Sequence, residues 1–346
     1  MKTILFCNLP YAFSILEPLA KELLTQNEEM IWYIPKELED IFPYKDMPYT
    51  TKIKDLKHYK SDVVFVPGND VPHFIQGIKV QVFHGLAGEK KGHFRIRDYF
   101  DLYLTQGPYF TQRFTKLSKK HKNFRVKETG WSKLDPLFSS SGKTVQKKEQ
   151  LLKQYNVKSI VLYSPTFSPS LTSAQKLLKM ITDISQNDDI LVIIKFHDKM
   201  DLDVIKHYQS IRSKNLIISK EKDILPLLQI ADIMISDTSS VVYEFILLNK
   251  PVITLNSTSE NIHWANCDNS QQVEKELYKI LNLEDDYKKE RETIISLYHP
   301  YTDGKSSQRM ISAIREYMVE YGIPKKRALP LLRKLKMLKK YFFNKG

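Results

Sequence analysis

Short apolar runs alternate with helical patterns along this 346-residue chain, and this alternation constrains the fold more than any other feature. Strands separated by helices form parallel sheets that are covered by helices on both faces. In the first part of the chain a helix is expected over about residues 15–24. Strands are predicted there at residues 3–7, 30–34, 63–66, 79–83 and 102–105. The pattern therefore predicts an α/β fold.

A polar stretch at residues 139–148 interrupts the pattern, and we place a domain junction there. A second alternation follows, with helices expected at 173–184, 202–213, 223–229 and 240–248, and strands at 160–163, 190–195, 216–218, 233–236 and 251–255. The prediction is two Rossmann-like, doubly wound domains at residues 1–140 and 148–322, followed by a tail at 323–346. Such domains bind ligands at the carboxyl ends of their strands, which suggests a cleft between the two.

The sequence lacks the motifs of several common enzyme classes. No glycine-rich dinucleotide fingerprint, phosphate-binding P-loop, Gly-x-Ser-x-Gly or His-Glu-x-x-His occurs, which argues against the common dehydrogenases, NTPases, serine hydrolases and zinc proteases. Cys7 and Cys267 are too few for a disulfide framework or a four-thiolate zinc site, and we expect buried thiols. Asp201 and Asp203 have a spacing that suits a divalent metal, but a helix start is the favoured interpretation. Neither a metal nor a cofactor is expected.

The first candidate site is His84, which follows an apolar strand and precedes Gly85. A histidine at the carboxyl end of a strand lies where open α/β sheets bind ligands. Its ordinary pKa of about 6.5 suits it to accept a proton at neutral pH. Gly85 lets the backbone turn without a side chain in the way. Nearby cations are suited to attract phosphate: Lys90, Lys91, Arg95 and Arg97. A capping histidine above a solvated basic loop is the structural alternative.

The second candidate site follows the apolar run at residues 190–194, where Lys195 and His197 lie two residues apart. Residues at this spacing point to the same side of a strand. Two groups able to carry positive charge at a strand end suit an anion. A lone histidine here would more often be structural, but the equivalent placement of His84 favours function.

The third candidate site is the turn Asp237-Thr238-Ser239-Ser240, which joins a predicted strand to a predicted helix. Ser239 or Ser240 is expected at the helix cap. Free backbone N–H groups and hydroxyls at a helix start favour an anion such as phosphate. Asp237 would repel a phosphate unless it orients the turn or meets a hydroxyl. A plain helix cap is the alternative.

Taken in order, these motifs resemble the CDP-glycerol:glycerophosphotransferase family, the teichoic-acid primases and polymerases with their capsule and lipopolysaccharide relatives. The resemblance covers about residues 80–315. Besides Phe83-His84-Gly85, Lys195-Phe196-His197 and Ser236-Asp237-Thr238-Ser239-Ser240, the matching segments are Thr129-Gly130-Trp131-Ser132-Lys133-Leu134-Asp135, Tyr163-Ser164-Pro165-Thr166-Phe167, Lys250-Pro251-Val252-Ile253 and Asp303-Gly304-Lys305-Ser306-Ser307-Gln308-Arg309.

The resemblance implies a GT-B fold whose first domain, residues 1–140, is the acceptor side and whose second domain binds most of the nucleotide. It also implies a metal-independent transfer of glycerol phosphate or a related polyol phosphate. The donor would be CDP-glycerol or another CDP-polyol, and the acceptor a lipid-linked molecule or a polysaccharide. His84 and His197 fall on the family's catalytic histidines. The residues expected to bind substrate are Gly85, Thr166, Lys195, Asp237, Thr238, Ser239, Ser240, Ser307 and Arg309.

The C-terminal tail is strongly basic: residues 321–346 hold nine basic and no acidic residues, in a chain of net charge +13. Four apolar residues recur there at helical spacing: Leu331, Leu335, Leu338 and Phe342. A basic amphipathic helix suits an anionic membrane surface, which we expect residues 325–345 to contact. Binding to nucleic acid, which is not expected, and packing on the protein itself are the alternatives.

No apolar run approaches the ~18 residues of a spanning helix, and the N-terminus is unlike a signal peptide. The expected location is therefore cytoplasmic, peripheral on the inner face of the cell membrane. Two rival functions remain at this point. One is a GT-B glycosyltransferase or epimerase that uses a CMP- or UDP-sugar. The other is a non-catalytic membrane or nucleic-acid binder.

Overall fold

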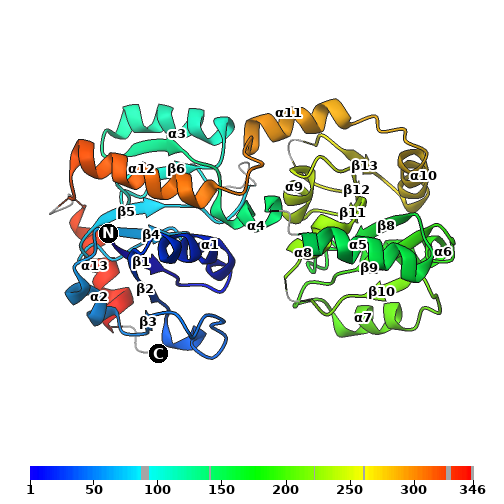
Figure 1. Cartoon of the computed structure of the whole chain (residues 1–346), viewed down its shortest axis with the longest axis horizontal. Helices are drawn as coiled ribbons and strands as arrows, with labels where there is room; N and C mark the ends of the chain where they lie inside the picture. Colours follow the sequence, from blue (N-terminus) through cyan, green and yellow to red (C-terminus); the bar gives the residue numbers. More distant parts are fainter. Residues whose placement is uncertain (87–92, 140–141, 222, 260–261, 325–328, 344–346) are drawn as a thin grey trace. The chain divides into compact units, whose positions relative to one another are not determined.

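The computed structural model describes residues 1–86, 93–139, 142–221, 223–259, 262–324 and 329–343. The chain divides into two compact units, each with a parallel sheet (Figure 1). Unit 1 comprises Met1–Phe138 and Leu297–Gly346, and unit 2 comprises Ser139–Ser296. The end of the chain therefore returns to the unit in which it began.

Unit 1 contains a seven-stranded sheet in the order β3-β2-β1-β4-β5-β6-β7, with every neighbouring pair parallel. The central strands form because they are short apolar runs; all four residues of β4, for example, are buried. The strands are β1 Lys2–Phe6, β2 Glu29–Tyr33, β3 Tyr49–Thr50, β4 Val63–Val66, β5 Ile78–Gln81, β6 Leu102–Thr105 and β7 Arg125–Glu128.

Helices flank this sheet, and the last long one comes from the end of the chain. Helix α12 contacts α1, and Arg315 of α12 donates to Glu28 at 2.6 Å and to Gln26 at 2.7 Å. The helices of unit 1 are α1 Ala12–Thr25, α2 Ile53–Tyr59, α3 Pro108–His121, α4 Asp135–Phe138, α12 Ser306–Tyr321 and α13 Leu331–Leu338, with the short helices η1 Lys36–Leu38, η2 Ser132–Leu134 and η3 Lys339–Phe343.

Unit 2 contains a six-stranded parallel sheet in the order β10-β9-β8-β11-β12-β13. Its strands are β8 Ser159–Tyr163, β9 Ile190–Ile194, β10 Leu216–Ile218, β11 Ile233–Ser236, β12 Val252–Leu255 and β13 Ala265–Cys267. Its helices are α5 Gly142–Tyr155, α6 Ala174–Ile184, α7 Leu202–Gln209, α8 Leu225–Ile230, α9 Val241–Ile246 and α10 Ser270–Leu281, while α11 Lys288–Tyr298 runs to the boundary with unit 1.

The core of unit 2 shows why its helices form where they do. Helix α6 buries Leu177, Met180, Ile181 and Ile184, which have the i, i+3, i+4 spacing of one helical face. These residues share one apolar cluster with residues of β8, β9, β11, α7 and α10. The sheet is covered by this cluster on one face, while α5 contacts α8 elsewhere.

The structure confirms the predicted α/β fold with two doubly wound units, and most predicted strands lie within one or two residues of their observed bounds. The predicted strand at residues 79–83 ends earlier, at Gln81. Phe83 has a φ of +60°, outside the extended conformation of a strand. The predicted helix at 202–213 ends at Gln209. Most of the polar stretch at 139–148 is helix, since α5 begins at Gly142.

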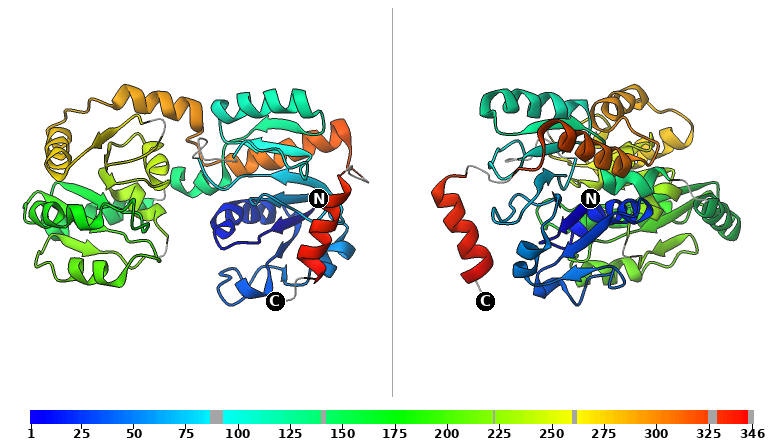
Figure 2. Two further views of the ribbon diagram at one scale, coloured as in Figure 1. Left: turned by 180° about the vertical axis from the view of Figure 1, so that it is seen from behind. Right: turned by 60° about the vertical axis from the view of Figure 1, so that its left-hand side comes forward.

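The predicted extent of the second domain, 148–322, was wrong at its C-terminal end. Residues from Leu297 onward belong to unit 1, because α12 packs on α1 and its first turn is held by Asp135. The predicted tail is also part of unit 1, and α13 is a helix at the surface of this unit (Figure 2). Arg333 of α13 pairs with Asp98, and Lys340 of η3 pairs with Asp70. One face of the tail helix is therefore packed on unit 1, which was one of the alternatives stated for the tail.

Candidate functional site

In unit 2 the strand order reverses between β8 and β11, which are neighbours although β9 and β10 intervene in the chain. Because all the strands are parallel, their carboxyl ends share one edge of the sheet, which we call the carboxyl edge. Ligands of open α/β sheets bind at this edge, where the order reverses. The segments that follow β8, β9 and β11 carry Thr166, Lys195, His197 and the turn 237–240, so the structure brings these predicted residues to the same edge.

Asp237 joins the loops on the two sides of this reversal. It follows β11 and has no exposed surface. Its carboxylate accepts hydrogen bonds from the backbone N–H of Thr166 at 2.9 Å, and from the N–H and hydroxyl of Ser173, each at 2.8 Å. Burial raises the pKa of Asp237, while these hydrogen bonds act in the opposite direction. Asp237 was predicted to bind substrate, and in the structure its buried carboxylate holds the loop that carries Thr166.

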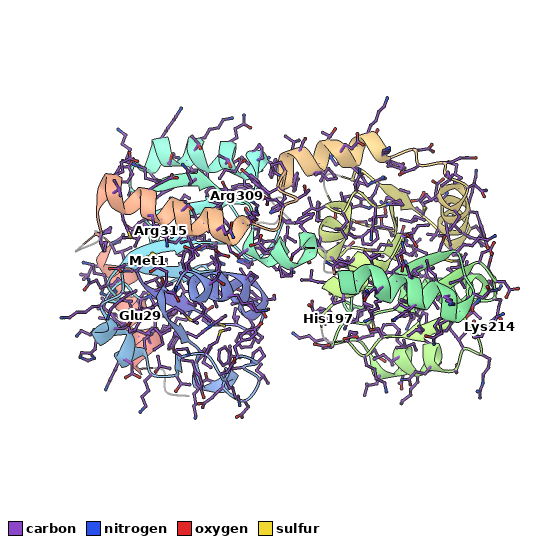
Figure 3. All side chains as sticks on the ribbon, viewed as in Figure 1. Met1, Glu29, His197, Lys214, Arg309 and Arg315 are labelled. Atoms are coloured by element: carbon purple, nitrogen blue, oxygen red, sulfur yellow. The ribbon has the colours of Figure 1, made fainter. Side chains whose placement is uncertain are left out.

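His197 follows β9, and Figure 3 labels it at the opposite end of the unit 2 sheet from Lys214, which precedes β10. Its Nδ1 accepts a hydrogen bond from the backbone N–H of Lys199 at 3.1 Å. A nitrogen that accepts carries no hydrogen, so in the neutral ring the hydrogen is on Nε2. Partial burial lowers the pKa of His197, which favours this neutral form at pH 7. The ring packs against Phe167, with centroids 4.4 Å apart. His197 thus presents a hydrogen-bond donor.

Lys195 lies two residues before His197 with its side chain largely buried. Its Nζ donates to the carbonyl of Phe196 at 2.8 Å and lies 4.0 Å from Asp198 Oδ1. An ammonium has three donors, so these contacts leave it capacity for a further acceptor. The arrangement supplies one cation beside the His197 donor.

The turn from Thr238 to Ser240 leads into the short helix α9. Thr238 Oγ1 accepts from the backbone N–H of Thr258 at 3.0 Å, and Ser239 Oγ is 3.5 Å from the N–H of Val241. Ser240 begins the helix but makes no capping hydrogen bond with its side chain, which is exposed. The predicted position of the cap is confirmed, whereas its hydroxyl bond is not formed. The six residues of α9 make a weak dipole, so an anion here would depend mainly on the hydroxyls and nearby N–H groups.

In unit 1, His84 follows β5 at the carboxyl edge of that sheet. Its Nδ1 lies 3.0 Å from the carbonyl oxygen of Pro67, which follows β4. A carbonyl only accepts, so Nδ1 carries the hydrogen and Nε2 of the neutral ring is left with a lone pair. The exposed ring packs on Tyr11, with centroids 5.4 Å apart. His84 therefore presents an acceptor, the opposite polarity to His197.

The backbone before and after His84 differs from expectation. Phe83 has a φ of +60°, a conformation that is uncommon for a bulky side chain and clusters at functional sites. The strained residue is thus Phe83, and Gly85 is not required for the turn. A Cβ added at Gly85 would have no atom within 4 Å. The absence of a side chain at Gly85 would therefore affect binding only if a ligand approached this backbone.

The loop after β4, at the same edge of the unit 1 sheet as His84, contacts the end of the chain, which the sequence pattern did not predict. Asp70, in the loop after β4, accepts hydrogen bonds from Lys340 Nζ at 2.6 Å and from the Tyr341 hydroxyl at 3.2 Å. The Tyr341 ring meets Phe6 edge-on, with centroids 6.0 Å apart. Burial raises the pKa of Tyr11 to about 12, and the charge on Asp70 adds to this effect. The segment after α13 therefore reaches the carboxyl edge of unit 1.

Ser307 and Arg309 were predicted to bind substrate, and in the structure the backbone of Ser307 and the side chain of Arg309 have partners within the protein. Asp135 accepts from the backbone N–H groups of Ser306 and Ser307, each at 2.7 Å, and Ser307 is buried. Arg309 donates through Nε to the carbonyl of Thr129 at 2.8 Å and through NH1 to Asp303 at 2.8 Å. The segments 129–135 and 303–309 thus bind each other within unit 1.

Two smaller predictions can also be compared with the structure. The Asp201 carboxylate accepts from the N–H of Asp203 at 2.8 Å and from that of Val204 at 3.3 Å, so it caps α7 as the helix-start interpretation expected. Lys90 and Lys91 lie outside the described residues. Both cysteines are buried free thiols, as predicted. No helix among the described residues has the length and apolar character needed to cross a membrane.

Two curated proteins resemble the chain in sequence. It is 25% identical to the teichoic acid glycerol-phosphate primase of Bacillus subtilis (strain 168) over 228 residues, 61% of this chain and 57% of that protein. It is 26% identical to the teichoic acid ribitol-phosphate polymerase TarL of Staphylococcus aureus over 230 residues, 56% of this chain and 39% of TarL. The chain thus spans about half the length of these relatives or less.

Solved structures show the same fold at low sequence identity. The wall teichoic acid polymerase TagF superposes with a TM-score of 0.63 and 16% identity, over 92% of this chain and 89% of the TagF chain. The S. aureus MnaA–UDP structure gives a TM-score of 0.65 and 16% identity, over 95% and 100% of the two chains. These likenesses confirm the predicted GT-B-like fold.

The sequence profile of one family covers much of the candidate site. The profile described as CDP-glycerol:poly(glycerophosphate) glycerophosphotransferase matches residues 77–261, which include His84, His197 and the turn 237–240. Because this match extends over more than half of the sequence, the chain belongs to the CDP-glycerol:poly(glycerophosphate) glycerophosphotransferase family.

Proposed function

We propose that this protein transfers glycerol phosphate, or a related polyol phosphate, from a CDP-linked donor to a hydroxyl group of a lipid-linked or polysaccharide acceptor, releasing CMP. The reaction would serve the synthesis of a bacterial cell-surface polymer. The observation that carries the proposal is the opposite polarity of His84 and His197, one presenting an acceptor nitrogen and the other a donor. Family membership supplies the reaction class.

Unit 2 is the proposed donor-binding unit. Lys195, His197 and the hydroxyls of Thr238, Ser239 and Ser240 are cationic or hydrogen-bonding groups at one sheet edge, and they suit a diphosphate. Thr166 lies at the same edge, held there by Asp237. TagF, which shares this fold, has been solved after a soak with CDPG, which supports a CDP-linked donor here.

His84 is the proposed general base. A polyol hydroxyl is a poor nucleophile at neutral pH, and loss of its proton during attack makes it a better one. In the proposed step the acceptor oxygen forms a bond to the β-phosphorus of the donor, and the bond from that phosphorus to the CMP oxygen breaks. CMP leaves with the electron pair, while the hydroxyl proton passes to Nε2 of His84. The bond from Nδ1 to Pro67 holds the ring in the tautomer that can accept it.

His197 is proposed to act on the donor. Its Nε2–H would donate to a phosphate oxygen whose charge changes during transfer, and Lys195 would add positive charge beside it. Because the N–H of Lys199 fixes the tautomer, no proton has to move before this bond can form.

Replacement of each histidine by alanine tests the two roles. His84→Ala is expected to lower CMP release by about 10²–10⁴-fold while the Kd for CDP-glycerol stays the same. His197→Ala is expected to weaken donor binding as well as turnover. His58→Ala is a matched control, because His58 Nδ1 also lies on a backbone carbonyl, that of Lys54, at 3.1 Å. Turnover of His84→Ala within a few-fold of that of the His58 control would refute the base role.

The choice of donor separates this proposal from its rivals. Calorimetry with CDP-glycerol, CDP-ribitol, a CMP-sugar and a UDP-sugar should show binding of a CDP-polyol and much weaker binding of both sugar nucleotides. Tighter binding of a sugar nucleotide would favour a glycosyltransferase or epimerase. Absence of binding to all four would favour the non-catalytic alternative.

A contact with the inner face of the cell membrane is part of the proposal. Leu331 and Leu335 are 70% and 52% exposed on α13, Lys336 is exposed on the same helix, and Lys339 is exposed at the start of η3. An apolar stripe flanked by lysines is suited to an anionic membrane surface, where each cation adds about 1 kcal/mol. A lipid-linked acceptor would be reached there.

A further inference from the structure

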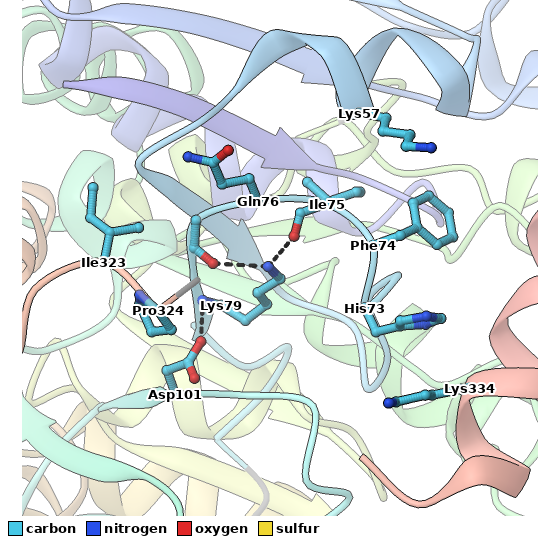
Figure 4. A pocket seen from close by; sticks show the side chains of 11 residues that line it. Lys57, His73, Phe74, Ile75, Gln76, Lys79, Asp101, Ile323, Pro324 and Lys334 are labelled. Carbon is cyan, nitrogen blue, oxygen red and sulfur yellow. Dashed lines mark hydrogen bonds between the residues drawn. The ribbon is translucent and has the colours of Figure 1, made fainter. Parts of the chain in front are cut away.

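Unit 1 contains a pocket of about 780 Å³ that no step of the proposed reaction uses (Figure 4). It is lined by Lys57 of α2, by the segment 73–77 before β5, by Lys79 and Asp101 at the starts of β5 and β6, and by Ile323, Pro324 and Lys334 from the end of the chain. It therefore lies where β5 and β6 begin, whereas His84 follows the end of β5. Pocket and candidate site occupy opposite edges of the sheet.

The charged groups on the inner wall of the pocket are hydrogen-bonded to the protein backbone. Lys79 is buried, and its Nζ donates to the carbonyl of Ile75 and, at 2.9 Å, to that of Gly77. Asp101 accepts from the backbone N–H of Lys79 at 2.8 Å, and Figure 4 shows these bonds on one side of the pocket. The carboxylate of Asp101 is thus anchored to the backbone of the strand beside it.

The outer part of the pocket carries uncompensated positive charge. Neither Lys57 nor Lys334 makes an ion pair with any residue that the structure describes. His73 lies beside Lys334 (Figure 4), and its buried Nδ1 has no hydrogen-bond partner within the described ranges. After burial, the charges of Lys334 and Lys79 are the causes that lower the pKa of His73. Three groups able to donate to an anion therefore line one opening.

The surface next to this opening is apolar. On a helix, residues three or four apart are neighbours on the surface, so Leu331 lies next to Lys334, and Leu335 lies one turn after Leu331 on the same face. Both leucines are exposed, while Met337, on the other side of α13, is buried. Arg333 donates to Asp98 at 2.7 Å, which holds the helix in this orientation. Phe74, Ile323 and Pro324 add apolar lining to the pocket itself.

We propose that this pocket binds the phosphate headgroup of an anionic membrane lipid, with Lys57, His73 and Lys334 around the phosphate and the acyl chains along the exposed leucines of α13. The inference rests on the membrane contact proposed above and does not depend on the donor. A lipid fits better than a free phosphate compound, because Lys334 of the charged opening lies on the same helix as the exposed Leu331 and Leu335. A diffuse attraction to the membrane would involve the basic tail alone, whereas this site also needs Lys57 of α2 and His73 of the segment before β5.

Vesicle sedimentation with matched variants separates a site from diffuse charge. The full chain is mixed with phosphatidylglycerol–phosphatidylcholine vesicles, without nucleotide, and two double variants are compared. Lys57→Gln/Lys334→Gln removes two pocket cations, while Lys54→Gln/Lys336→Gln removes one cation outside the pocket from each of the same two helices. The pocket variant is expected to lose at least tenfold more affinity than the control. Equal losses would overturn the proposal, since both variants have the same net charge.

Nuclear magnetic resonance of His73 identifies the ligand. The ring-proton signals, assigned with His73→Gln, are followed during titration with short-chain phosphatidylglycerol below its micelle concentration, with the matching phosphatidylcholine, and with glycerol 3-phosphate. A saturable shift with phosphatidylglycerol, at a concentration at least tenfold lower than either of the others requires, supports the site. No shift, or an equal shift with glycerol 3-phosphate, overturns a lipid site. Because no CDP-glycerol is present, this result stands whether or not the proposed transfer is correct.

Discussion

Arg309 joins three segments of unit 1, and its replacement by alanine distinguishes a structural role from the substrate contact that the family resemblance implied. Its guanidinium donates to the carbonyl of Thr129, to both carboxylate oxygens of Asp303 and to the hydroxyl of Ser306. It also lies over the ring of Tyr301, 4.1 Å from the centroid. We therefore expect Arg309→Ala to destabilise unit 1 and to leave the affinity for donor unchanged.

The size of the effect follows from these contacts. Loss of the bond to Thr129, which is buried, leaves a carbonyl without its partner and costs about 1–3 kcal/mol. The half-exposed pair with Asp303 contributes about 1 kcal/mol or less, and the contact with Tyr301 about 0.5–1 kcal/mol. The expected loss is about 3 kcal/mol. At about 2–4 °C per kcal/mol for a domain of this size, the melting transition of unit 1 should fall by about 6–12 °C.

Differential scanning calorimetry measures this shift, and its pH dependence checks the cause. Hydrogen bonding by Arg309 lowers the pKa of Asp303, so the pair stabilises the folded state above the unfolded pKa of about 3.9. That stability is lost as the pH falls through the lower folded pKa. The difference in Tm between wild type and Arg309→Ala should therefore narrow below about pH 4. Gln308→Ala, next in the same helix, serves as the control.

The reasoning fails if Arg309→Ala keeps the wild-type Tm but weakens donor binding or raises the KM for acceptor tenfold or more. Such a result would mean that the guanidinium leaves its partners to bind substrate. It would restore the role implied by the resemblance.

Three further substitutions test other parts of the candidate site. Asp237→Ala should destabilise unit 2 by about 2–4 kcal/mol, because it leaves the N–H groups of Thr166 and Ser173 without their acceptor; an unchanged urea midpoint would contradict the positioning role. Gly85→Ala should leave the Tm within about 2 °C of the wild-type value, because the added Cβ meets no atom within 4 Å. It should raise the KM for acceptor if the acceptor passes close to this backbone. An unchanged KM would show that the acceptor does not approach Gly85. Tyr341→Phe removes the bond to Asp70 and should lower the free energy of unfolding by about 1 kcal/mol. It should change the KM for acceptor and leave the Kd for donor unchanged. A changed Kd with an unchanged KM would show that Tyr341 does not serve acceptor binding.

The sequence predicted the sheets well because their strands are determined locally. A run such as Ile190–Ile194 is apolar at every position, which is typical of a strand buried on both faces. The histidines at the strand ends could be found for the same reason, since the end of such a run marks the edge where ligands bind. Asp201 was also predictable as a helix start, because its bonds go to residues two and three positions away.

Features that depend on distant contacts were missed. Nothing in the composition of residues 303–309 shows that they bind segment 129–135, so the last long helix was assigned to the second domain. Tyr341 is 271 residues from Asp70, and the basic pattern of the tail gives no sign that one of its lysines pairs with that aspartate. The left-handed backbone of Phe83 arises from its tertiary surroundings, since phenylalanine has no local preference for it.

The opposite polarity of the two histidines also combines a local and a distant cause. The Nδ1 of His197 is held by a backbone N–H two residues ahead, so a turn within the segment 197–199 suffices to make Nε2 a donor. The Nδ1 of His84 is held by the carbonyl of Pro67, seventeen residues earlier, which is near only because β4 and β5 are paired in the sheet. The two histidines therefore have different tautomers, although both follow a strand, because a different backbone group contacts Nδ1 in each. A mutation that shifts the β4–β5 pairing would change the proton acceptor at His84 without altering the histidine itself, whereas the donor at His197 would persist as long as its own turn is intact.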